Sequence, residues 1–153
     1  MDNIKLSIHH VGGRAGSRSF PHLIKFEKDI INVLYDADED CLEQIKSRNQ
    51  HLESQLHVLP YALSDKCKTS VININYDPYT SSLLESNKLF DSYYMFNNNH
   101  DYIMGETTKT VEKRNIEVES IDHIFGSNNG SFPKPDYLSI DVEGGEYDIL
   151  KGS

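Results

Sequence analysis

The sequence predicts an α/β domain, a three-layer sandwich in which helices cover both faces of a mostly parallel β-sheet. Residues 4–11 are a short, mostly alternating apolar stretch that ends at two glycines, as a strand entering a tight turn does. Ile30–Tyr35 is a continuous apolar run, the pattern of a strand buried on both faces of a parallel sheet. Strand and helix patterns then alternate along the chain, and this order produces parallel sheets with helical crossovers.

The next two elements are a helix and a strand. Residues 39–50 place apolar side chains at helical spacing among charged ones, which predicts a helix lying on the sheet. Residues 56–63 are predicted to form the following strand. Pro60 should lie toward its carboxyl end, because proline cannot donate a ladder hydrogen bond.

The second half of the chain has shorter elements and longer loops. We predict three strands, at residues 71–74, 116–120 and 137–142, and two helical segments, at residues 121–125 and Glu146–Lys151. Ser120 is placed to cap the first helical segment. Residues 77–100 and 126–135 are expected to be loops, and loops as long as the first are usually lids or binding segments, or disordered.

The charge of the chain excludes two classes of partner. Its 153 residues, which we expect to form one domain over 1–153, include 15 Lys and Arg against 24 Asp and Glu, a formal net charge of −9. Such a surface repels phosphate backbones and anionic lipids, so we expect neither nucleic acid nor a membrane as a partner. The three cations within residues 109–114 are expected to lie on a solvated face.

Cysteine usage and the N-terminus point to a cellular compartment. Cys41 and Cys67 have the spacing neither of a metal site nor of a disulfide framework, and we expect free thiols. No apolar run approaches the ~20 residues that cross a bilayer. Residues 1–3 lack the pattern of a signal peptide. We therefore expect a soluble, cytoplasmic protein.

Two features after the first and second predicted strands favour a nucleoside cofactor. Gly12, Gly13 and Gly16 allow a sharp turn and close approach of a ligand to the backbone. Asp36, twenty residues after Gly16, can accept hydrogen bonds from both hydroxyls of a ribose. Each feature alone has a simpler interpretation. The glycines could form a plain turn, and Asp36 could be an acid near a helix N-terminus. The glycine spacing departs from G-x-G-x-x-G, which leaves a nicotinamide-dependent oxidoreductase as a weaker alternative.

A third feature follows the last predicted strand. Asp141, Glu143 and Glu146 surround a glycine pair directly after apolar residues. Three neighbouring acids need solvent, hydrogen bonds or a cation to stay ionised. We predict no metal site here, although a divalent cation held by these carboxylates remains an alternative reading, since hard cations prefer oxygen ligands.

Together these segments resemble the FkbM family of S-adenosylmethionine-dependent methyltransferases. The resemblance rests on the glycine turn at residues 12–16, Asp36, Ala-Leu-Ser-Asp at 62–65, Ser81-Ser82-Leu83, Ile121-Asp122, and the closing block I-D-V-E-G-G-E-Y-D-I-L-K-G at 140–152. It spans nearly the whole chain, and the closing block is its most specific part. It implies a Rossmann-like fold and O-methyl transfer from S-adenosylmethionine to a hydroxyl of a sugar or natural-product-type small molecule.

The resemblance also assigns the cofactor. Gly12, Gly13 and Gly16 would border the methionine part. Asp36, with Ala37 beside it, would hold the ribose. The adenine ring would lie along a third pair of residues, Ala62 and Leu63.

For catalysis, the resemblance places Asp141 at the transferred methyl group and the acceptor. Asp141 is then the predicted base or orienting acid, with Glu143 or Glu146 as second choices.

Two departures from the family pattern give an alternative function. The family usually carries an acid before the glycine turn, where it meets the ammonium of the methionine part, and this chain has His10. A neutral imidazole accepts a hydrogen bond there, whereas a protonated one repels the ammonium. The chain also stops at Ser153, so we expect it to lack the family's C-terminal strands. The alternative is a degenerate module that binds a partner or glycan without chemistry.

Overall fold

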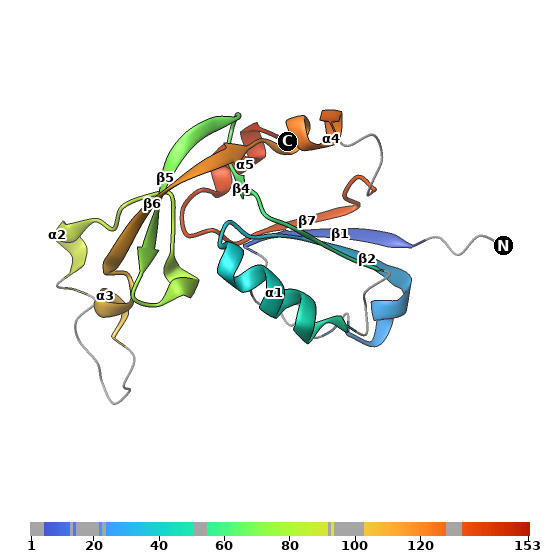
Figure 1. Cartoon of the computed structure of the whole chain (residues 1–153), viewed down its shortest axis with the longest axis horizontal. Coiled ribbons are helices and arrows are strands. Elements are labelled where there is room, and N and C mark those ends of the chain that lie inside the picture. The colour runs from blue at the N-terminus through green and yellow to red at the C-terminus, as the bar shows by residue number, and fades with distance from the viewer. Residues whose placement is uncertain are drawn as a thin grey trace.

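Two β-sheets organise the chain (Figure 1). The computed structural model describes residues 5–12, 14, 22, 24–50, 55–91, 93, 103–127 and 133–153. The main sheet has the order β3-β2-β1-β7, and all its neighbouring strands are parallel. Its strands are β1 (Leu6–Val11), β2 (Ile30–Tyr35), β3 (Leu56–Leu59) and β7 (Tyr137–Ile140).

The second sheet has the order β4-β6-β5 and mixed direction. Its strands are β4 (Ala62–Leu63), β5 (Lys68–Asn75) and β6 (Thr110–Glu119). The short β4 runs parallel to β6, and β5 pairs with β6 antiparallel along its whole length. This sheet was not predicted.

Helices lie on both faces of the main sheet. The helical elements of the described residues are η2 (Ile24–Asp29), α1 (Glu39–Arg48), η4 (Pro78–Thr80), α2 (Lys88–Asp91), α3 (Met104–Thr107), α4 (Ile121–Ser127) and α5 (Glu146–Lys151). Of these, α2 and α3 lie beside the second sheet (Figure 1), and η4 contacts β5. Figure 1 shows α1 on one face and α4 and α5 on the other. Among the described residues, no helix is long and apolar enough to cross a membrane.

Alternate side chains of β2 pack into two hydrophobic clusters, one on each face of the main sheet. Val33 and Tyr35 pack with residues of α4 and α5, while Leu34 packs against Cys41 and Ile45 of α1. A strand that supplies apolar side chains to both faces reads as a continuous apolar run, which is why residues 30–35 predicted a parallel sheet. The α/β sandwich with a mostly parallel sheet is confirmed.

The strand predicted over residues 56–63 is divided between the two sheets. β3 ends before Pro60, where the Tyr61 amide bonds the Leu59 carbonyl at 2.9 Å. The chain then leaves the main sheet, and Ala62–Leu63 pairs with β6 instead. The apolar pattern continues through the break because both halves face apolar surroundings, and proline, which has no amide hydrogen, marks the position of the break.

β5 and β6 extend well beyond the predicted segments 71–74 and 116–120. The cations of residues 109–114 lie at the start of β6, where Arg114 pairs in register with Ile72. Lys109 and Lys113 are exposed, as predicted, whereas Arg114 is half-buried. The strand there was missed because its exposed face is charged and gives no apolar alternation.

Candidate functional site

A cavity of about 170 Å³ opens at the carboxyl ends of β1, β2 and β7. The second sheet closes its other side with Leu63, Ile72 and Ile74, and η4 adds Tyr79. In parallel sheets the carboxyl ends of the strands are the usual place for ligands. The cavity therefore lies where the sequence predicted a site.

Gly12 forms the floor of the cavity where β1 ends. Its φ is +81°, and a Cβ there would lie 2.0 Å from the Asp141 carbonyl oxygen. The Gly12 amide donates to the Tyr35 carbonyl, and the Asp141 amide donates to the Val11 carbonyl, each at 3.0 Å. Glycine is required here because the turn after β1 touches the backbone after β7.

Asp36 follows β2 and lines the cavity together with Ala37. Its Oδ1 accepts the Asp38 amide at 2.9 Å. Burial raises the pKa of the Asp36 carboxyl, and the bond from Asp38 and the positive charge of Arg14 oppose that rise. The polar groups around Asp36 thus partly offset the effect of burial on its charge.

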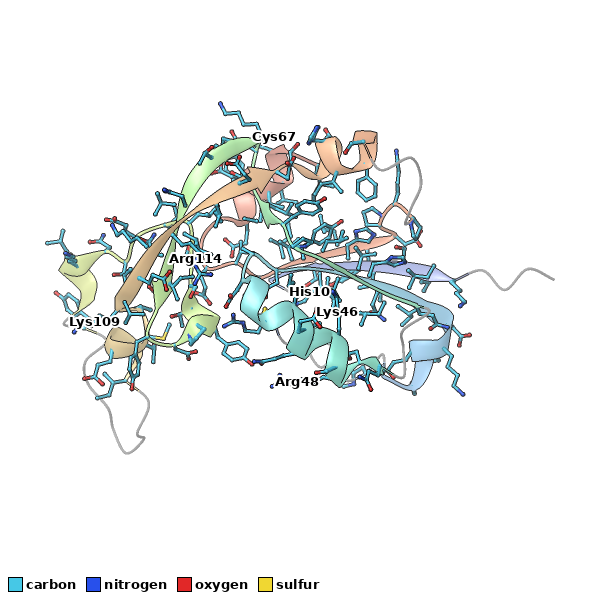
Figure 2. All side chains as sticks on the ribbon, in the orientation of Figure 1. His10, Lys46, Arg48, Cys67, Lys109 and Arg114 are labelled. Atoms are coloured by element: carbon cyan, nitrogen blue, oxygen red, sulfur yellow. The ribbon has the colours of Figure 1, made fainter. Side chains whose placement is uncertain are left out.

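His10 lies on the α1 side of β1 and also lines the cavity (Figure 2). Its Nδ1 is 3.0 Å from Ser139 Oγ, on the strand position that pairs with it in register. Burial lowers the pKa of His10, and the carboxylates of Asp141 and Asp36 oppose the change. The imidazole is therefore neutral at pH 7, so it does not carry the charge that would repel an ammonium group.

The three acids of the closing block have different surroundings. Asp141 and Glu143 line the cavity. Within the described part of the chain, no side chain forms a hydrogen bond or ion pair with the Asp141 carboxylate. Glu146 Oε1 instead accepts the backbone amides of Val142 and Gly144, at 3.3 and 3.2 Å. Glu146 therefore holds the turn and is not part of the cavity wall.

The turn that carries Glu143 is shaped by its backbone. Glu143 has a φ of +57°, in the left-handed region that residues with a Cβ rarely adopt. Its carbonyl accepts a 2.9 Å hydrogen bond from Ser82 Oγ, which ties the turn to the segment after η4. Burial raises the pKa of Glu143, and the charges of Asp141 and Glu146 add to the rise.

Ala62 and Leu63 are buried on β4 and present an apolar wall to the cavity. The predicted residues His10, Gly12, Asp36, Ala37, Ala62, Leu63, Asp141 and Glu143 thus line one cavity, from four strand ends. Gly13 and Gly16 lie outside the described residues.

Comparison with protein families agrees with this arrangement. The model of the methyltransferase FkbM domain matches residues 10–153. The chain belongs to the FkbM methyltransferase family. Searches of curated proteins and of solved structures give no match. Family membership supports a methyltransferase, and the parallel sheet with its flanking helices agrees with the Rossmann-like fold of such enzymes.

Sequence reasoning missed several cavity residues of this FkbM-family chain. Arg14 forms an ion pair with Asp38, and its guanidinium lies 5.5 Å from the centre of the Tyr79 ring. These contacts join the turn after β1 to the start of α1 and to η4. No periodicity marks such residues, because they meet only when the second sheet closes over the main one. For Ser82 the sequence did give one indication, because this residue belongs to the serine-rich segment of the family pattern.

Proposed function

We propose that this chain transfers a methyl group from S-adenosylmethionine to a hydroxyl of a sugar or natural-product-type small molecule. The observation that supports the proposal most is that Gly12, Asp36 and Asp141 line one cavity. They follow three parallel strands that are neighbours in the main sheet. Nucleoside cofactors bind at such carboxyl ends, with an acid at the ribose.

The cavity offers a surface for each part of the cofactor. Gly12 and neutral His10 would meet the methionine part, where an uncharged imidazole can accept a hydrogen bond from an ammonium group. Asp36 would bind the ribose hydroxyls beside Ala37. The adenine would lie against Ala62 and Leu63. Gly13 and Gly16 remain predictions for the methionine end.

When bound, S-adenosylmethionine supplies an activated methyl group on a sulfonium, which leaves as a neutral thioether. The contribution of the protein is then to position the acceptor and to take its proton. We assign the uptake of the acceptor's hydroxyl proton to the Asp141 carboxylate. Asp141 lines the cavity, and no described side chain forms a hydrogen bond or ion pair with its carboxylate. With cofactor and acceptor bound, Asp141 would orient the acceptor hydroxyl and take up its proton.

Calorimetry tests the cofactor half of the proposal. The wild type should bind S-adenosylmethionine and S-adenosylhomocysteine with micromolar affinity, and Asp36→Ala should abolish both signals because the ribose loses its acceptor. Asp29→Ala is the matched control, since Asp29 is exposed and lies at the other end of β2. Absence of heat with either nucleoside, on protein with a cooperative melting transition, would refute the cofactor assignment.

Turnover tests the catalytic half. Asp141→Asn should keep nucleoside affinity within about threefold and slow methyl transfer to hydroxylated acceptors by roughly 10²–10⁴, the usual contribution of a general base. Transfer at the wild-type rate would remove Asp141 from the mechanism.

The second candidate function is a module that binds without chemistry, and His10 in place of the family's acid favours it. Nucleoside binding with no product across a panel of sugars and other hydroxylated acceptors would support it. Any methylated product would exclude it.

A further inference from the structure

A second group of chemically reactive side chains lies outside the cavity, where β6 passes into α4. Cys67 is in the turn between β4 and β5, Glu119 is the last residue of β6, and His123 is in α4. Figure 2 shows Cys67 at the end of the second sheet that is remote from Lys109. None of the three lines the cavity.

The three side chains meet at one point. Cys67 Sγ lies 3.0 Å from Glu119 Oε2, and His123 Nδ1 lies 2.5 Å from the same oxygen. One ligand atom from each residue, sulfur, oxygen and nitrogen, lies within 4.8 Å of the other two. The cysteine is separated from the glutamate by 52 residues, so the fold and not local sequence brings them together.

We propose that Cys67, Glu119 and His123 bind a divalent transition-metal ion, with Zn²⁺ as the preferred ion. Thiolate, imidazole and carboxylate are the three ligand types that zinc takes in tetrahedral sites. The thiolate and imidazole select against Mg²⁺ and Ca²⁺, which require oxygen ligands. Cys67 and His123 are exposed, so the ion has an entry path and solvent can supply the fourth ligand.

The surrounding structure holds the ligands in place. Glu119 and His123 are four residues apart across the start of α4, where Ser120 Oγ accepts the His123 amide at 3.2 Å. The Glu119 carboxylate faces both partners, with its Oε2 within hydrogen-bond distance of Cys67 Sγ and of His123 Nδ1. In the metal-bound form, the Cys67 thiol loses its proton to solvent. The His123 ring keeps one proton, on Nε2, and binds the ion through Nδ1.

A metal ion at this point would join three segments at the end of the second sheet. Cys67 would connect the β4–β5 turn to the junction between β6 and α4. The same junction already receives the end of α5, since the Asp122 amide donates to the Gly152 carbonyl at 2.9 Å. The site therefore has a structural role that is separate from the cavity.

Titration of the whole chain with Zn²⁺ and with Co²⁺, under reducing conditions, tests the proposal. We expect one ion per chain, micromolar or tighter affinity for Zn²⁺, a higher melting temperature, and a thiolate-to-cobalt charge-transfer band in the near ultraviolet. Cys67→Ser and His123→Ala should each weaken Zn²⁺ binding by at least about tenfold, because even changes to groups that only orient a ligand cost 10–100-fold. Cys67→Ser should also remove the band.

His22→Ala is the matched control, because His22 is an exposed histidine that does not belong to this group. It should leave zinc affinity and the cobalt spectrum unchanged. The proposal is overturned if the wild type binds no zinc, or if Cys67→Ser and His123→Ala, with wild-type circular dichroism, bind it as the wild type does. Nucleoside binding should be the same in all these variants, which separates this test from that of the methyltransferase cavity.

Discussion

At the scale of single residues, the ribose-binding role that we propose for Asp36 opposes the stability of the fold. Burial raises the pKa of its carboxyl, so the folded chain disfavours the ionised form relative to the unfolded chain. A group whose pKa is raised in the folded state contributes stability at low pH and loses that contribution as pH rises through the folded pKa. At pH 7 the charge of Asp36 is therefore a destabilising feature of the ligand-free protein.

Asp36→Asn should separate the two effects. The amide oxygen can still accept the Asp38 amide, while the buried charge is gone. We expect the melting temperature at pH 7 to rise by a few degrees and nucleoside binding to weaken. Asp29→Asn, at an exposed acid, should change neither quantity. A fall in the melting temperature would show that the charge of Asp36 is stabilising.

The sequence predicted Asp36, His10 and Asp141 as site residues because each falls directly after or at the end of a recognisable strand. Only the family resemblance ranked Asp141 before Glu146, because the spacing of the two acids does not reveal how their surroundings differ. Glu146 begins α5 and turns back to backbone amides, and its role is visible only once the turn is built. Spacing places an acid near a strand end, whereas hydrogen bonding determines whether its carboxylate is available.

At the scale of elements, α4 depends on its first turn. Ser120 is buried and its hydroxyl accepts the His123 amide, as the sequence predicted for an N-cap. The helix spans only Ile121–Ser127, so it is too short to be stable without such contacts.

Ser120→Ala should lower the free energy of unfolding by about 1 kcal/mol, the usual cost of losing an N-cap. Urea denaturation measures this change. Ser127→Ala, at the exposed end of the same helix, should stay within about 0.5 kcal/mol of wild type. Equal effects of the two changes would argue against the cap.

The sequence predicted an element correctly where its whole apolar pattern belongs to one sheet. β2 faces apolar cores on both sides, and its predicted limits agree with the structure. The single strand predicted over residues 56–63 was wrong, because this one apolar run contributes to two sheets. The second sheet was not predicted for two reasons. Its main pair, β5 and β6, comes from segments far apart in sequence, and β6 is mostly polar on its exposed face.

At the scale of the whole molecule, His9 joins three segments within the core. It is fully buried, and its Nε2 lies 3.0 Å from the Pro133 carbonyl oxygen, which can only accept. Nε2 therefore carries the proton, and Nδ1 accepts the Tyr35 hydroxyl at 2.9 Å. Burial lowers the pKa of His9 from 6.5 to about 4. The neutral ring thus connects β1, β2 and the segment before β7.

This pKa predicts a loss of stability in mild acid. Below pH 6.5 the unfolded chain gains a proton on His9 that the folded chain does not take up until about pH 4. The contribution of His9 is therefore present above pH 6.5 and lost toward pH 4, by about 2 kcal/mol between pH 7 and pH 5.

Urea denaturation of the wild type and of His9→Gln at the two pH values measures this loss. The stability difference between the two proteins should shrink by about 2 kcal/mol from pH 7 to pH 5, because glutamine does not titrate. A difference that is constant with pH would assign acid sensitivity to other groups.

The close approach of Gly12 to the Asp141 carbonyl also sets an order of events during synthesis. β1 is made long before its neighbour β7, since His10 and its partner Ser139 are 129 residues apart. A nascent chain can pair β1 with β2 early, while the other edge of β1 stays open until β7 leaves the ribosome. A nascent chain that ends before Asp141 lacks part of the cavity lining, so the proposed cofactor would stabilise the fold only after β7 and the turn that follows it have been made.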